Sequence, residues 1–202
     1  MVVTRHEGKT SHTVRGPETQ PTSAECPAGG EWFAIRFKLG TFMPALRPGR
    51  LRDRNDANLP NATVRSFWLD TLAWEFPTFD NAEIFVNRLA ARELIDVDPT
   101  VSAALRNDPH ELTTRTAQRH VLNATGLTHG AIRQIERARL ATNLLRRGDS
   151  ILDATFQAGY YDQAHLTRSL KRFIGQTPAQ ISRGERQLSF LYNTAARSPL
   201  TV

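Results

Sequence analysis

The chain has 202 residues, 40% of them hydrophobic, with 26 Lys and Arg against 20 Asp and Glu and a single cysteine, Cys26. This composition excludes a disordered chain, and one cysteine excludes a disulfide framework or a Cys-based zinc site within one chain. The sequence contains no run of about 20 apolar residues and its start lacks an apolar signal core, so we expect a cytoplasmic protein with no membrane partner.

The charge is unevenly distributed along the chain. Residues 1–111 carry 13 Lys and Arg against 15 Asp and Glu, whereas residues 112–202 carry 13 against 5. A cationic second part favours a nucleic-acid or acidic-membrane partner, and a solvated basic surface is the alternative. The basic run RPGRLRDR (47–54) in the first part is offset by Asp53 and Asp56. We therefore expect the electrostatic attraction for an anionic partner to reside in the second part.

Residues 1–79 have the pattern of short strands and turns. Their β-branched residues are interrupted by Gly8 and Gly16, and WFAIRFKLGTF alternates in part up to Gly40. PALRPGRLRDRNDANLP (44–60) is rich in turn residues and predicts an exposed loop, while SFWLDTLAWEFPTF (66–79) suits a last strand or a packing surface. We therefore predict an α+β protein that begins with a small β-rich domain, with few strands for a closed sandwich or barrel.

From Asp80 the pattern becomes helical. Residues 80–97 predict a connecting helix, with one face formed by Ile84, Phe85, Leu89 and Ala90. Residues 98–192 predict a second, all-α domain, and residues 193–202 a flexible tail. Six helix starts and three helix stops inside this domain follow from capping residues and glycines. The starts are at Asp98-Pro99, Thr113, Thr128, Ser150 with Asp153, Asp162 and Thr177-Pro178, and the stops are at Gly126, Gly148 and Gly159.

Residues 151–171 have the spacing of a helix-turn-helix, in which the second helix enters the DNA major groove. We expect Ile151, Leu152 and Phe156 to pack inward from the first helix, and Gly159 to adopt the left-handed turn conformation. The second helix carries hydrogen-bonding side chains away from its apolar stripe. Such a face is either solvated or built to contact a polar, anionic partner.

The residues I-x-D-x-x-x-x-x-G-Y-x-D-Q-x-H-L-T-R-x-x-K-R-x-x-G-x-T-P, from Ile151 to Pro178, resemble the signature of AraC-type (AraC/XylS) transcription regulators. That family's DNA-binding unit has two helix-turn-helix motifs joined by a long linking helix. LTTRTAQRHVLNATGLT (112–128) is similar to its first recognition helix and IRQIERARLATNLLRRG (132–148) to its linker. Two departures are Ala154-Thr155 in place of Val-Ala, and a longer connection, ALRNDPHEL (104–112), inside the first motif.

The resemblance implies a sequence-specific regulator that reads adjacent major-groove segments with recognition helices at 113–124 and 162–173. The implied base-contacting residues are Arg115, Gln118, Arg119, Gln163, Ala164, His165 and Arg168, and the implied phosphate-contacting residues are Thr113, Thr167 and Lys171. The alternatives are a structural ion pair of Arg119 or Arg168 with Glu136 or Asp153, and an exposed helix position without a role for His165.

Residues 1–79 resemble a shortened cupin-like sensor domain of some AraC-type regulators, through GPET, GEWFAIRFKLGTFMPAL and SFWLD. The resemblance implies double-stranded operator DNA as the partner, and it allows RNA polymerase, a small-molecule effector at the N-terminal domain and a homodimer. We expect no cofactor, no metal and no enzymatic activity. The alternatives are a cupin-type metal-binding enzyme with a helical appendage, suggested by His6 and His12, and a non-specific DNA-binding protein.

Overall fold

The computed structural model describes residues 1–22, 28–53, 57–106, 113–185 and 188. These residues form two compact units: residues 1–17 and 28–128 belong to the first, residues 18–22 and 129–188 to the second. The division falls inside the domain predicted over 98–192, and the predicted domain boundaries stay a prediction. The expected flexible tail and most of the connection at 104–112 lie outside the described residues.

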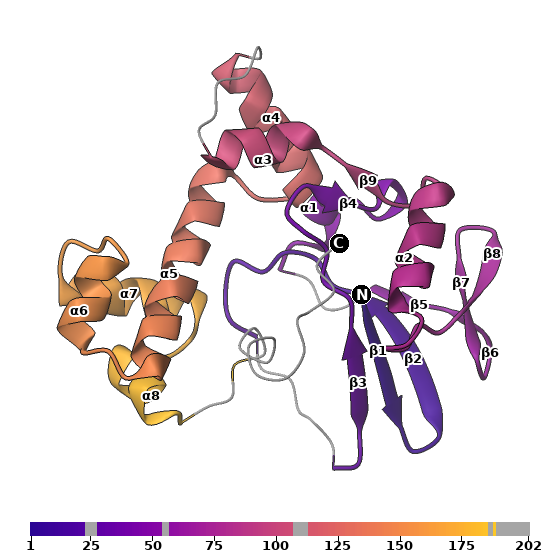
Figure 1. The fold of residues 1–202 in the computed structure, drawn as a ribbon, viewed down its shortest axis with the longest axis horizontal. Helices are drawn as coiled ribbons and strands as arrows, with labels where there is room; N and C mark the ends of the chain where they lie inside the picture. Colours follow the sequence, from indigo (N-terminus) through magenta and orange to yellow (C-terminus); the bar gives the residue numbers. More distant parts are fainter. Residues whose placement is uncertain (23–27, 54–56, 107–112, 186–187, 189–202) are drawn as a thin grey trace. The chain divides into compact units, whose positions relative to one another are not determined.

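The first unit contains the predicted strands. Strands β1 (Val2–His6) and β2 (Lys9–Val14) form a hairpin, and β3 (Glu31–Ala34) and β5 (Ala57–Leu59) extend it to an antiparallel sheet in the order β3-β1-β2-β5. The hairpin turn consists of Glu7 and Gly8, both with positive φ, as a two-residue turn matched to strand twist requires. The α+β fold class, with a β-rich N-terminal region and a helical C-terminal region, is confirmed (Figure 1).

Two expectations for this unit are wrong in detail. The segment 66–79, predicted as a last strand or a packing surface, holds two strands, β7 (Ser66–Leu69) and β8 (Leu72–Glu75), and β7 lies between β6 (Asn61–Thr63) and β8 in a three-stranded sheet. Asp70, at a φ of 56°, makes the tight turn between β7 and β8. The loop expected at 44–60 contains a 3₁₀ turn η1 (Pro44–Leu46), a helical turn α1 (Pro48–Leu51) and β5. Proline begins both turns, because its fixed φ suits the first helical position.

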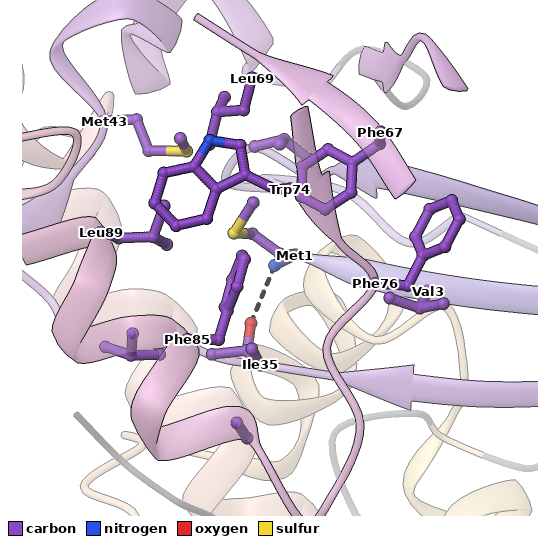
Figure 2. Packing of buried hydrophobic residues seen from close by; sticks show 13 residues of the cluster. Met1, Val3, Ile35, Met43, Phe67, Leu69, Trp74, Phe76, Phe85 and Leu89 are labelled. Atoms are coloured by element: carbon purple, nitrogen blue, oxygen red, sulfur yellow. Dashed lines mark hydrogen bonds between the residues drawn. The ribbon is translucent and has the colours of Figure 1, made fainter. Parts of the chain in front are cut away.

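The core of the first unit lies between these sheets and α2 (Ala82–Ala91), the predicted connecting helix. Figure 2 shows Phe67 of β7 and Trp74 of β8 next to Phe85 and Leu89 of α2. The helix is rotated from the predicted face: Ile84 is 63% exposed and Ala90 is exposed, whereas Ala82 and Val86 are buried. The aromatic side chains of the core pack against Phe85, Val86 and Leu89. This packing turns Ile84 and Ala90 toward solvent.

The last elements of the first unit are β9 (Asp96–Val97), α3 (Pro99–Arg106) and α4 (Thr114–Thr125). β9 pairs with β4 (Thr41–Phe42) in a separate two-stranded ladder. Helix α4 packs on α3, on α1 and on β4. The predicted start of α3 after Asp98, and the predicted cap and end of α4 at Thr113 and Gly126, are confirmed.

The second unit is helical: α5 (His129–Arg147), α6 (Ile151–Gln157), α7 (Gln163–Phe173) and α8 (Pro178–Arg183). Ser150, Asp162 and Thr177 accept hydrogen bonds as N-caps of α6, α7 and α8, as predicted. The inward face expected for α6 is wrong in part, because Leu152 and Phe156 are 62% and 63% exposed. Smaller residues, Ala154 and Ala158, face the core instead, which allows α6 to lie close to its neighbours.

Candidate nucleic-acid interface

The first predicted recognition helix, α4, presents its polar face to solvent. Arg115, Gln118 and Arg119 are exposed, whereas Ala117 and Val121 on the opposite side are buried. The helix begins where the Thr113 hydroxyl oxygen accepts the backbone N–H of Thr116 at 3.3 Å. The structure therefore brings the three predicted base-contacting residues of this helix onto one face, with Thr113 at its start.

A side-chain hydrogen bond ties α4 to the start of α3. Nδ1 of His120 lies 2.6 Å from Oδ2 of Asp98, whose Oδ1 accepts the backbone N–H of Thr100 at 2.9 Å. Burial by itself raises the pKa of Asp98, but the hydrogen bonds from His120 and Thr100 outweigh it, so the net pKa is lower than the ordinary value. The carboxylate of Asp98 thus caps the start of α3 and holds α4 at His120, the residue after Arg119.

The second predicted recognition helix, α7, has a hollowed polar face. Gln163, Ala164, Thr167 and Arg168 together line a shallow depression at the surface, and Lys171 is exposed one turn further on. The Thr167 hydroxyl donates to the backbone oxygen of Gln163 at 2.8 Å, so it must break that bond to donate to a phosphate. Six residues of α7 are predicted to contact DNA. Four of them line this depression, Lys171 is exposed one turn away, and His165 lies elsewhere.

His165 stands apart from this surface. Its side chain is half-buried, and its ring meets the ring of Tyr160 edge-on, with centroids 5.1 Å apart at 89°. Its backbone N–H donates to Oδ1 of Asp162 at 2.6 Å, which caps α7. The ring contact restrains the imidazole, so His165 differs from the freely solvated helix residue that the sequence left as an alternative.

Arg137 of α5 holds the turn between α6 and α7. Its Nε donates to the backbone oxygen of Ala158 at 3.2 Å, its Nη2 donates to that of Gly159, and its guanidinium carbon lies 4.4 Å from the centre of the Tyr160 ring. Arginine suits this place because its planar fork can bond two carbonyls while stacking on an aromatic face. Gly159 has a φ of 71°, as the predicted turn requires.

Tyr160 connects this turn to α7. Its hydroxyl shares a hydrogen bond of 2.8 Å with Oγ of Ser169, and burial raises its pKa, against smaller lowering effects of Ser169 and Arg137. Sequence reasoning missed Arg137, Tyr160 and Ser169. Their contacts join residues that are up to 23 positions apart, such as Arg137 and Tyr160, and no local pattern indicates them.

The predicted cations are available for a ligand. Within the described ranges, neither Arg119 nor Arg168 forms an ion pair with Glu136 or Asp153. The carboxylate of Asp153 instead accepts the hydroxyl of Ser150 at 2.6 Å. The described residues therefore do not support an ion-pairing role for Arg119 and Arg168 within the protein.

Metal binding and membrane insertion find no support in the described residues. Among the residues that the structure describes, no three His, Cys, Asp or Glu side chains gather where a metal ion could bind. The same residues include no helix with the length and apolar character needed to cross a membrane. His12, one of the two histidines behind the metal alternative, is instead buried against Phe67, at a ring-centroid distance of 4.1 Å.

Comparison with known proteins gives one match. Residues 110–184 match the family model described as a helix-turn-helix domain, and this range contains α4 through α8. Neither the curated proteins nor the solved structures contain a match to the chain. The match supports a DNA-binding transcription regulator.

Proposed function

We propose that this protein, whose residues 110–184 form a helix-turn-helix domain of the AraC type, is a sequence-specific regulator that reads two major-groove segments. The observation that carries the proposal is the exposed surface of α7, where Gln163, Ala164, Thr167 and Arg168 lie together over a buried apolar face. Side chains with amide and guanidinium groups are those that pair with adenine and guanine edges in the major groove.

The proposed roles follow the chemistry of each side chain. Arg115, Arg119 and Arg168 bind guanine edges, Gln118 and Gln163 bind adenine edges, and Ala164 contacts a thymine methyl group. His165, held against Tyr160, bonds a base at the edge of the α7 surface. Thr113, Thr167 and Lys171 contact phosphates, which set the position of the protein on the duplex.

The linking helix α5 supports the use of two groove segments. With 19 residues it is about 28 Å long, at 1.5 Å per residue, which is comparable with the ~34 Å between groove segments one turn apart. We assign the β-rich part of the first unit a sensor or dimerisation role, through an effector or a second copy of the chain. RNA polymerase is the proposed partner of the DNA-bound protein.

Selection of bound sites from random duplex DNA tests the proposal. A sequence-specific regulator selects a site with two conserved blocks about 10 base pairs apart and binds it at least 10³-fold more tightly than random DNA. A non-specific DNA-binding protein selects no consensus and binds all duplexes with one salt-dependent affinity. That second result would reject the proposed function.

A further inference from the structure

We infer that the helical turn α1 of the N-terminal region is an additional DNA-backbone contact, through Arg47, Arg50 and Arg52. This inference rests on the proposed function of α4 as a recognition helix, and it assigns phosphate binding to a region whose sequence is acidic as a whole. We name these three residues the α1 arginines. Arg47 precedes α1, Arg50 lies within it and Arg52 follows it.

The position of α1 next to α4 is fixed by close backbone contact. Gly126, the left-handed residue that ends α4, approaches α1 so closely that a Cβ atom on it would lie 2.8 Å from the Pro48 carbonyl carbon and the Gly49 nitrogen. At its last residue, α1 meets Gly16, where a Cβ would lie 2.4 Å from Cβ of Leu51. Figure 1 shows α1 next to α4 in the first unit. The turn is therefore held by two close contacts, one at each end.

The α1 arginines are available to bind a ligand. All three side chains are exposed, and in the described part of the chain none forms an ion pair. The acidic neighbour that offsets them in the sequence, Asp53, lies in a left-handed turn with a φ of 52°, and its backbone N–H donates to the oxygen of Pro17. Three exposed guanidinium groups within six residues are a surface that suits phosphate oxygens.

The length of α4 brings its C-terminal end, and α1 with it, toward the duplex backbone when its N-terminal half lies in the major groove. A helix of 12 residues is about 18 Å long, whereas the major groove is about 12 Å wide. When the half of α4 with Arg115, Gln118 and Arg119 lies against base edges, its C-terminal end extends toward the wall of the groove. Phosphates form that wall, and α1 is the element that contacts this end of α4.

A structural role is the competing explanation. Arginines near the C-terminal end of α4 also interact favourably with the negative end of its dipole, which would stabilise the fold without contacting DNA. The two roles separate in experiment. Phosphate contacts release counterions and change the salt dependence of DNA binding, whereas a dipole contact changes the stability of the free protein.

The test uses the full chain and three variants. The first replaces Arg47, Arg50 and Arg52 with Ala, and the second replaces the same residues with Lys. The control replaces Arg36, Arg65 and Arg92 with Ala, because these are exposed arginines of the same unit and the change in charge is identical. For each protein, the affinity for the selected site and for an unrelated duplex is measured as a function of salt, together with the melting temperature.

We expect the slope of log affinity against log salt to decrease by about 0.9 for each phosphate that the α1 alanine variant no longer binds. The decrease in affinity should be equal on both duplexes, because phosphates carry no base information. The lysine variant should keep most of the slope, and the control should keep all of it. An α1 alanine variant with the slope of the control would overturn the inference, including the case in which only its melting temperature falls.

The same data distinguish this inference from the proposed function. If the wild-type chain prefers no sequence but the α1 alanine variant still has a reduced slope, the proposed function fails and the phosphate contact stands. If the chain prefers its selected site and the α1 variant behaves as the control, the proposed function stands and the α1 contact is rejected.

Discussion

The two helices proposed to read DNA, α4 and α7, pack in different surroundings. Helix α7 packs in a cluster formed by α5, α6, α7 and α8 together with Tyr160 and Leu188, with Leu166 and Leu170 fully buried. Helix α4 packs on α3, and also on α1 and β4 of the N-terminal region, while β9, just before α3, pairs with β4. The support of α7 therefore comes from the second unit, in which Pro21 also lies close to the turn after α7, whereas α4 depends on α1 and β4 of the N-terminal region. A change in the N-terminal region can reach DNA binding through α4.

The largest expected effect compares two glycines with the same backbone conformation. Gly126 ends α4 and Gly159 follows α6, both at a φ of 71°. A Cβ at Gly159 meets nothing within 4 Å, whereas one at Gly126 meets α1 at 2.8 Å. Gly159→Ala should therefore cost about 1 kcal/mol of strain, and Gly126→Ala about 2–4 kcal/mol, because overpacking adds to the strain. Chemical denaturation measures both. Equal losses in the free energy of unfolding would show that the close contact of α1 with Gly126 does not constrain that position.

The next effect uses a histidine in the core of the first unit. His12 is fully buried, and burial, followed by the positive N-terminal amino group, lowers its pKa from 6.5 to about 3. The unfolded chain therefore binds a proton between pH 6.5 and 3 that the folded chain does not, so the free energy of unfolding falls as the pH falls through this range. Between pH 7 and 5 the loss attributable to His12 is about 2 kcal/mol.

His12→Leu should remove that part of the pH dependence. All three tryptophans, Trp32, Trp68 and Trp74, lie in the first unit, so their fluorescence during urea unfolding reports on this unit. In the wild-type chain, acid should therefore destabilise the first unit, which contains α4, before it destabilises the second unit, which contains α7. An unchanged pH dependence in the variant would contradict a buried neutral His12.

A smaller effect separates base reading from phosphate binding on α7. Arg168→Ala should weaken binding to the selected site by about 1–3 kcal/mol and affect random DNA less. Lys171→Ala should weaken both alike and reduce the salt slope by about one ion. Titration of both duplexes with both variants decides this. Equal losses on the two duplexes for Arg168→Ala would remove its role in base reading.

The smallest expected effect concerns the arginine that holds the second turn. Arg137→Lys keeps the charge but loses the fork that bonds the carbonyls of Ala158 and Gly159, so affinity for the selected site should fall by about 1 kcal/mol. Arg133→Lys, one turn away on α5 and exposed, is the matched control and should change nothing. Equal behaviour of the two variants in DNA titrations would show that the turn does not need Arg137.

Local chemistry explains what the sequence predicted well. Helix starts at Thr113, Asp162 and Thr177 and the turn at Gly159 depend on a few neighbouring residues, and the structure confirms them. The rotation of a helix about its axis depends on its partners. For that reason Ile84 of α2 and Phe156 of α6, predicted to face inward, are exposed.

The candidate site divides in the same way. The exposed surfaces of α4 and α7 could be predicted from helical spacing and the family resemblance, and the predicted residues lie on them apart from the half-buried His165. The contacts of Arg137 with the turn, and the contact of α1 with the end of α4, join distant parts of the sequence. Neither contact leaves a periodic or capping signal, so only the fold reveals them.

Whether two separate helices read two separate stretches of DNA is decided by the base preferences of two variants. Sites are selected with the full chain, with Arg119→Ala and with Arg168→Ala. Each variant should relax the preference in one block only, and the two relaxed blocks should lie about 10 base pairs apart, one turn of the duplex. Relaxation of the same positions by both variants, or of none by Arg119→Ala, would contradict the proposal of two reading helices.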